Sequence, residues 1–102
     1  MSAYFVFIRE KTLDQSELAI YFEQVSGTMQ GRGAKVLAAD GNYEVVEGAP
    51  AEAMLILEFP NIAAAKGWYN SPAYREAREH RFKASQYRVI LVEGVPPGRG
   101  EI

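Results

Sequence analysis

The stretch from Met54 to Tyr74 has the sequence MLILEFPNIAAAKGWYNSPAY, and it decides the fold. Residues 54–59 are mostly apolar and form too short a run for a helix, which favours a strand with apolar side chains on both faces. Pro60 ends strand pairing because it has no N–H group to donate, and Asn61 can cap a helix that begins at the next residue. This stretch therefore predicts a strand that must be covered on both sides.

The helix that follows this strand is interrupted. Gly67 weakens it, and a second helix start signal appears shortly afterwards. Ser71 can accept a hydrogen bond from a free N–H group, and Pro72 has a backbone φ angle that is preset for the first helical turn. We therefore predict two helical segments, of which the second extends from Pro72 to about Ala84.

Three further runs are interpreted as strands, and the first of them is rich in aromatic and β-branched residues, which favour this structure. The three runs are Ala3–Ile8, Lys35–Ala39 and Tyr87–Glu93. Residues Tyr43–Val46 follow the turn dipeptide Asp40-Gly41. They form either a short separate strand or the continuation of a bulged strand, and the sequence leaves both possibilities open.

A first helix is predicted after Asp14, which is a typical N-cap residue. Glu17 stands three residues later, in the position of a capping-box partner. Gly31 and Gly33 end the helix, and they explain the Gly-Arg-Gly run better than a phosphate-binding loop does. One apolar stripe of this helix is expected to pack on the sheet. Its residues are Leu18, Phe22, Val25 and Met29.

The predicted order of strands and helices is typical of an α+β fold built as a split βαβ unit. Its sheet is antiparallel, and both helices, the second of them broken, lie on one face. The first, central and last strands carry large apolar side chains on both faces, which two helices on one side cannot cover. Soluble monomers rarely expose more than a few hundred Å² of contiguous apolar surface. We therefore predict a symmetric homodimer that pairs through its sheet faces.

Length and composition bound the remaining possibilities. The chain has 102 residues, no cysteine and a net charge of −2. We expect a single domain over residues 1–95, with residues 96–102 as a flexible tail. The lack of cysteine excludes disulfides and thiolate metal sites, and the absence of a basic field argues against nucleic acid as a partner. Tyr4–Ile8 is too short for a membrane span or a signal peptide, so we expect a cytoplasmic protein without a membrane partner, metal or cofactor.

Several short motifs together resemble the family named domain of unknown function 1330. The resemblance covers Tyr4 to Val95. Its motifs are Glu58-Phe59-Pro60, the run WYNSPAY at residues 68–74, Glu47-Gly48 and the closing LVEG at residues 91–94. The resemblance implies a ferredoxin-like fold of the dimeric α/β-barrel superfamily, and it implies no established activity. Relatives in that superfamily include cofactor-free monooxygenases of aromatic substrates, lactone isomerases and haem-dependent enzymes, so the fold alone assigns no reaction.

A candidate ligand site surrounds the break between the two helical segments. Arg81 follows Tyr74 by seven residues, which places both on nearly one helix face, and it could anchor a carboxylate or an enolate. The alternative is structural: the aromatic rings pack on the sheet, Ser71 caps a helix, and Arg81 pairs with a nearby acid. The predicted ligand-binding residues are Trp68, Tyr69, Ser71, Tyr74 and Arg81.

Candidates for proton handling are Glu58, His80 and Arg81. Glu58 shares a strand face with Met54 and Ile56, so it is either desolvated and basic or placed at a strand end in contact with water. His80 is the only histidine, and it lies in a highly charged segment that favours a solvated helix face. A single histidine without other metal-ligating residues at suitable spacing does not indicate a metal site.

Three functional hypotheses follow from these patterns. The first is a small dimeric protein that binds an aromatic or acidic organic molecule in a cleft between helices and sheet. The second is a cofactor-free enzyme of the monooxygenase or isomerase type. The third is a structural dimer module without a ligand, which a fully packed aromatic cluster would favour.

Overall fold

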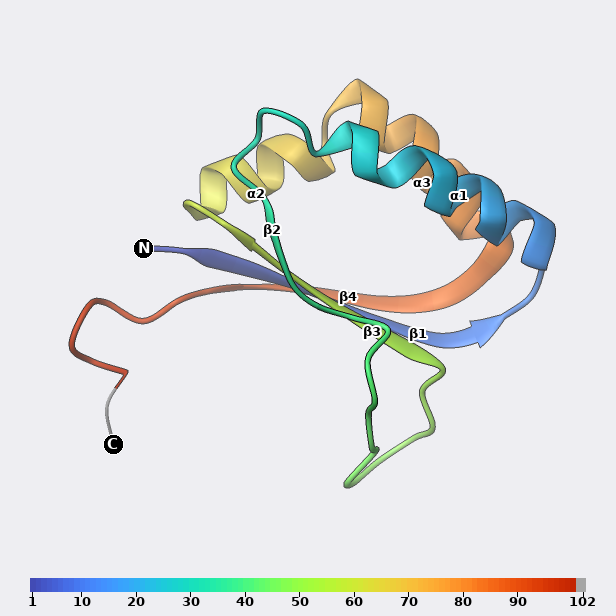
Figure 1. Ribbon diagram of the computed structural model, residues 1–102, viewed down its shortest axis with the longest axis horizontal. Coiled ribbons are helices and arrows are strands. Elements are labelled where there is room, and N and C mark those ends of the chain that lie inside the picture. The colour runs from blue at the N-terminus through green and yellow to red at the C-terminus, as the bar shows by residue number, and fades with distance from the viewer. Residues whose placement is uncertain (101–102) are drawn as a thin grey trace.

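The four strands form one antiparallel sheet in the spatial order β2-β3-β1-β4. The computed structural model describes residues 1–100. The strands are β1 (Ala3–Thr12), β2 (Lys35–Ala39), β3 (Ala53–Phe59) and β4 (Ser85–Glu93). The helices α1 (Gln15–Thr28), α2 (Ile62–Tyr69) and α3 (Pro72–Ala84) all lie on one side of this sheet (Figure 1). The ferredoxin-like α+β fold is thereby confirmed.

The predicted helix starts are confirmed by the hydrogen bonds at the caps. The Asn61 side chain accepts a bond of 2.7 Å from the Ala64 N–H group, and Ser71 Oγ accepts one of 3.2 Å from Tyr74. Asp14 Oδ1 accepts from the backbone N–H groups of the first turn of α1. Each cap satisfies an N–H group that the helix itself leaves free. The break between α2 and α3 therefore lies where the sequence predicts it.

The connection between β2 and β3 differs from the sequence interpretation. Residues Tyr43–Val46 form neither a separate strand nor a continuation of β2. The bulge lies earlier, inside β2, where the register shifts between Val36 and Ala38. The Tyr43 hydroxyl instead donates a hydrogen bond of 2.8 Å to the Ala51 carbonyl, so this side chain closes a loop. The loop extends from the sheet in the direction away from the helices (Figure 1).

The core lies between the helices and one face of the sheet. Side chains alternate along β1, so Phe5 and Phe7 point toward the helices and are buried. Leu57 and Phe59 of β3 do the same. Trp68 of α2 lies at the centre of this cluster, with its ring centroid 5.4 Å from that of Phe59. The core therefore depends on aromatic packing around one tryptophan.

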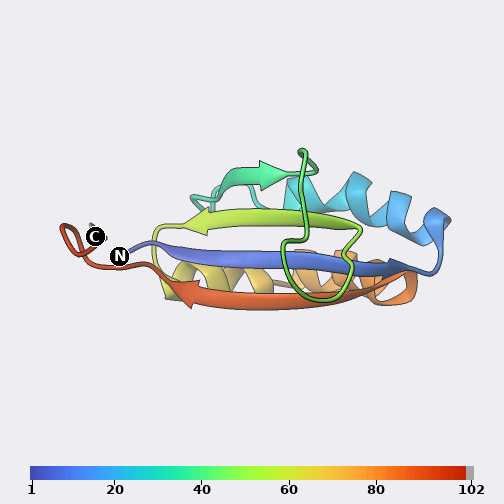
Figure 2. The same ribbon diagram turned by 90° about the horizontal axis from the view of Figure 1, so that it is seen from below.

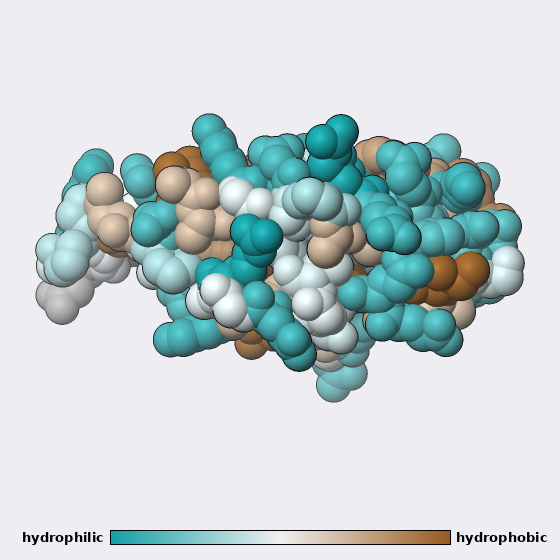
Figure 3. All heavy atoms as spheres, turned by 90° about the horizontal axis from the view of Figure 1, so that it is seen from above, coloured by the Kyte–Doolittle hydropathy of each residue, from teal (hydrophilic) through white to brown (hydrophobic). Residues whose placement is uncertain are grey.

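The opposite face of the sheet, here called the open face, carries apolar residues that no helix of residues 1–100 covers. Val6 is paired with Ile56 on β3 and with Ile90 on β4, so these three side chains form a row across the sheet. Ile90 is 43% exposed and Val92 is 51% exposed. Figure 2 views the molecule from this side, with the strands in front of the helices. The helix side, in contrast, is largely hydrophilic (Figure 3).

The predicted tail is only partly within the described structure. Residues 96–100 include a turn closed by a hydrogen bond from the Arg99 N–H group to the Pro96 carbonyl. Residues 101–102 lie outside the described residues. The division into a domain of residues 1–95 and a flexible tail stays a prediction.

Candidate ligand cavity

A cavity of about 200 Å³ lies between α1 and the edge of the sheet formed by β2, β3 and β1. It is located on the helix side of the sheet, so it is separate from the open face. Most of its wall is apolar. The wall is formed by Phe7, Arg9, Tyr21, Phe22, Val25, Met29, Val36, Ala39, Asp40, Ala53, Met54, Leu55 and Tyr87.

The cavity exists because small residues face α1 at this edge of the sheet. Ala39 of β2 is paired with Leu55, and Ala53 of β3 is paired with Arg9, so methyl groups occupy positions where larger side chains would fill the space. On the opposite wall, α1 contributes Val25 and other apolar side chains. The predicted apolar stripe of α1 is confirmed for Leu18, which is buried, and for Val25 and Met29, which pack against the core and also line this cavity. Phe22 is the exception, because it is 47% exposed at the cavity wall.

Three charged residues lie at the cavity: Arg9 and Asp40 line it, and Glu52 pairs with Arg9. Arg9 lies with its Nε atom 3.5 Å from a Glu52 carboxylate oxygen, and its Cζ atom lies 5.9 Å from the centroid of the Phe22 ring. Glu52 also accepts a hydrogen bond from Thr12, which lowers the pKa of Glu52 and keeps it ionised. Asp40 lies on the exposed side with a φ angle of 53°, a conformation that Asp tolerates better than most residues.

The hydroxyl groups of Tyr21, in the cavity wall, and Tyr74, in the core, lie next to one another. The hydroxyl oxygens of Tyr21 and Tyr74 lie 2.8 Å apart, and both side chains are buried. Burial raises the pKa of Tyr21, of Tyr74 and of Tyr87, although the Arg81 guanidinium opposes this effect at Tyr74. All three phenols are therefore neutral at pH 7.

Arg81 is buried next to these tyrosines. Its side chain is 3% exposed, and its Nη2 atom donates a weak hydrogen bond of 3.4 Å to the Tyr69 hydroxyl. Its Cζ atom lies 5.7 Å from the ring centroid of Phe7 and 5.1 Å from that of Tyr87, both of which line the cavity. Among residues 1–100 no carboxylate forms an ion pair with Arg81, and its Nε atom has no hydrogen-bond partner.

The residues predicted to bind a ligand are close together, but none of the five lines the cavity. Trp68 and Tyr74 are fully buried, with their ring centroids 4.1 Å apart. Tyr69 is half-buried over the Arg78 guanidinium. Arg81 and Tyr74 lie directly behind the cavity wall, because they contact Tyr87 and Tyr21. A ligand-binding role for the five predicted residues stays a prediction.

Ser71 links the two helical segments through its hydroxyl group. Oγ donates a hydrogen bond of 2.7 Å to the Trp68 carbonyl and accepts one from the Tyr74 N–H group. Both hydrogen-bonding functions are thus occupied by the backbone.

Replacing Ser71 by alanine is expected to lower the free energy of unfolding by about 1 kcal/mol, the usual cost of losing an N-cap. Urea denaturation measures this change. Binding of an apolar probe in the cavity should be the same in S71A and the wild-type chain. Weaker probe binding without loss of stability would instead place Ser71 in the ligand site.

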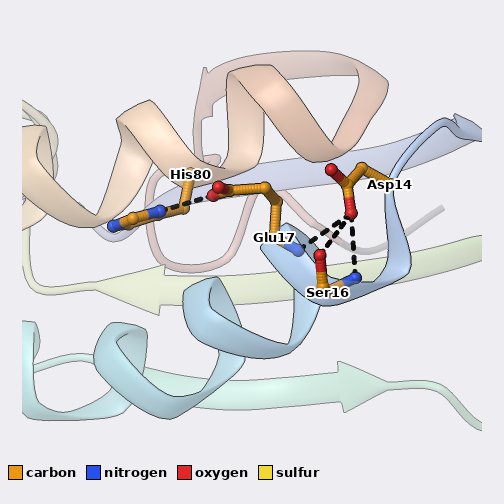
Figure 4. A network of polar contacts seen from close by, with 4 residues as sticks. All are labelled: Asp14, Ser16, Glu17 and His80. Atoms are coloured by element: carbon orange, nitrogen blue, oxygen red, sulfur yellow. Dashed lines mark hydrogen bonds and ion pairs between the residues drawn. The ribbon is translucent and has the colours of Figure 1, made fainter.

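The other two candidates for proton handling lie elsewhere. Glu58 is half-buried on the open face, where its carboxylate accepts a hydrogen bond of 3.1 Å from the Tyr4 hydroxyl. His80 of α3 and Glu17 of α1 point toward one another, with His80 Nδ1 2.6 Å from Glu17 Oε2 (Figure 4). Glu17 was predicted as a capping-box partner of Asp14, and this is wrong because its carboxylate is directed to His80. The pair joins two helices rather than lining a cavity.

Sequence reasoning missed four cavity residues that carry polar groups, namely Arg9, Tyr21, Asp40 and Tyr87. Arg9 belongs to β1, which extends beyond the predicted end at Ile8 as far as Thr12. Tyr21 lies beside the predicted stripe of α1 at a helical spacing of three from Leu18, but Phe22 is also at helical spacing from Leu18, so spacing alone does not distinguish the two. Tyr87 lies in the predicted last strand, and its strand pattern does not indicate a role at the cavity.

No group of three or more His, Cys, Asp or Glu side chains that could hold a metal ion occurs in the described part of the chain. Over the same residues, no helix combines the length and the apolar character needed to cross a membrane.

The comparisons with solved structures show the fold. A protein of unknown function from Rhodopseudomonas palustris, RPA0582, is 23% identical, with a TM-score of 0.70 over 94% of this chain and 84% of its own. A dimeric ferredoxin-like protein of unknown function from Jannaschia sp. CCS1 is 11% identical, with a TM-score of 0.65 over 92% of this chain and 100% of its own. SnoaB from Streptomyces nogalater, described as a cofactor-independent oxygenase, is 11% identical, with a TM-score of 0.64 and 98% coverage of both chains.

No curated protein matches the chain. The family model described as domain of unknown function (DUF1330) matches residues 2–95.

Proposed function

The chain belongs to the DUF1330 family, whose description states no activity, and from this premise we propose that it is a homodimeric protein that binds one small aromatic molecule per subunit. The ligand occupies the cavity between α1 and the sheet. The dimer forms through the open face.

The cavity is the observation that carries this proposal. Its volume of about 200 Å³ is comparable to that of an engineered apolar cavity of about 150 Å³ that binds benzene. An apolar wall with a few polar groups at defined positions is typical of small-molecule sites. Phe22 and Tyr87 supply aromatic side chains, and Arg9 supplies a polar group in the wall. A single substituted aromatic ring suits this space.

Dimerisation through the open face is compatible with this site. The cavity lies between α1 and the sheet, so a second subunit that packs on the open face does not occupy it. Structural neighbours from Jannaschia and from Bacteroides fragilis are described as dimeric. The exposed apolar row around Val6 and Ile90 supports the same pairing for this chain.

A cofactor-free enzyme is the second candidate function. Its support is the likeness in fold to SnoaB, together with the position of Arg81 beside the cavity. Glu58 and His80 do not line the cavity, so neither is placed to move a proton there. The binding function needs only the cavity itself, and it is therefore preferred.

The test uses 4-nitrotoluene as a neutral probe and the full-length protein. Binding should shift the amide NMR signals of residues that line the cavity. The variant A39L adds volume at the cavity wall and is expected to weaken binding about tenfold or more, because overpacking of a filled site is costly. The matched control A63L places the same side chain at an exposed position of α2 and should bind the probe normally. Equal binding by both variants would contradict the proposed site.

A further inference from the structure

Arg81 carries a buried positive charge that no carboxylate balances in the described part of the chain. The side chain is 3% exposed, and its Nε atom is without a hydrogen-bond partner. The two ion pairs of residues 1–100 involve Arg9 and His80 instead. Removing a charge from water is unfavourable unless an opposite charge or several hydrogen bonds compensate for it. The surroundings of Arg81 therefore favour the entry of an anion.

The groups near Arg81 do not provide that anion. The phenols are neutral at pH 7 because burial raises the pKa of Tyr74 and of its neighbours. Arg9 is paired with Glu52, and Asp40 is exposed, so water screens its charge. The charged and titratable groups around Arg81 and the cavity are Arg9, Tyr21, Asp40, Glu52, Tyr69, Tyr74, Arg78 and Tyr87.

Arg81 acts on the cavity through two aromatic rings. Its Cζ atom lies 5.1 Å from the Tyr87 ring and 5.7 Å from the Phe7 ring, and both rings line the cavity. A ligand ring stacked on the far side of Tyr87 would lie roughly 9 Å from the guanidinium if about one contact distance is added. At an effective dielectric constant of about 20, Coulomb attraction over this distance corresponds to about one pKa unit for an acidic ligand.

We propose that the cavity binds an aromatic hydroxy compound in its anionic form, as a phenolate or an enolate. The positive charge of Arg81, which lies behind Phe7 and Tyr87 of the cavity wall, favours binding of the anion over binding of the neutral form. This inference rests on the proposed function, because it requires that the cavity holds a ligand. Arg81 is a positioning residue here, since it does not line the cavity. Selection of the anion defines the chemical class of the ligand, which the size and the apolar wall of the cavity alone do not define.

The test compares 4-nitrophenol with 4-nitrotoluene, which have similar size and shape. Nitrophenolate absorbs visible light and nitrophenol does not, so a pH titration of the complex reports the protonation state of the bound probe directly. In the wild-type protein the apparent pKa of the bound nitrophenol should be about one unit below that of the free compound. At a pH above both values the phenolate should then bind about tenfold more tightly than the phenol does at low pH. Equal pKa values for the bound and free probe would overturn the inference.

Three variants assign the effect to Arg81. R81Q removes the charge and should abolish the pKa shift, while R81K keeps the charge and should retain most of the shift. R78Q is the matched control: it removes a charge from the same helix, where Arg78 stacks on Tyr69 and not on the cavity wall, and it should leave the shift unchanged. If R81Q fails to fold, the wild-type, R81K and R78Q titrations still decide the matter. A shift lost in R78Q would overturn the inference, whereas failure of both probes to bind would contradict the proposed function itself.

Discussion

Replacing Trp68 by alanine is expected to lower the free energy of unfolding by about 3–5 kcal/mol, the usual cost of removing a buried Trp or Phe side chain. Trp68 is fully buried, and its ring contacts those of Phe5 and Tyr74. Its Nε1 atom donates a hydrogen bond of 2.9 Å to Thr28 Oγ1, which ties α2 to the end of α1. The substitution therefore leaves a cavity and also removes a hydrogen bond between helices. Because small domains are stable by only about 5–15 kcal/mol, W68A should lose much of its stability.

Urea denaturation at one fixed protein concentration measures this change, since dimerisation makes apparent stability depend on concentration. F82A is the matched control, because Phe82 is an aromatic residue of α3 that is 53% exposed. Its expected cost is below about 1 kcal/mol. If W68A were no less stable than F82A, Trp68 would not be the centre of the core, and its predicted role in ligand binding would gain support.

Local signals explain why the framework is predictable from sequence. The helix start at Ser71 and Pro72 depends on a side-chain hydrogen bond and a preset φ angle, which are properties of adjacent residues. The strand at residues 54–59 is similarly marked by its apolar run and by Pro60. The ferredoxin-like order of elements follows from these signals and from the aromatic and β-branched run at the start of β1.

The cavity was not predictable, because it depends on which of several equivalent positions meet in space. On α1, Tyr21 and Phe22 are both at helical spacing from Leu18, and only the packing of α1 against α3 decides that Tyr21 is buried. On β1, the charged residues after Ile8 interrupt the apolar run, yet the strand continues because β4 supplies a pairing partner for residues as far as Thr12. The position of Arg9 at the cavity is a consequence of this pairing.

The environment of Arg81 was also not predictable from the sequence. The sequence allowed either a ligand anchor or an ion pair with a nearby acid. Acidic residues surround Arg81 along α3, but a helix places them on other faces, and the guanidinium is directed among aromatic rings instead. Spacing alone establishes that Arg81 and Tyr74 share a face. It does not establish that this face is buried.

Replacing Val6 by arginine is expected to convert a dimer into the 11.3 kDa monomer. Val6 lies at the centre of the open face, between Ile56 and Ile90, and it points away from the helices. In the proposed dimer an arginine at this position would be buried between two sheets without a partner, and the two-fold symmetry would bring two such charges together. A cost of several kcal/mol raises the dissociation constant by on the order of a thousandfold.

Light scattering at micromolar concentration measures the mass of each variant. The matched control A19R places the same charge at an exposed position of α1 and should remain dimeric. Circular dichroism should show that V6R retains its secondary structure, since the core on the helix side of the sheet is unchanged. A V6R variant that remains dimeric would mean that the subunits pair through a different surface. A wild-type protein that is monomeric at the same concentration would remove the basis for dimerisation, and the exposed row of Val6, Ile56 and Ile90 would then require another partner.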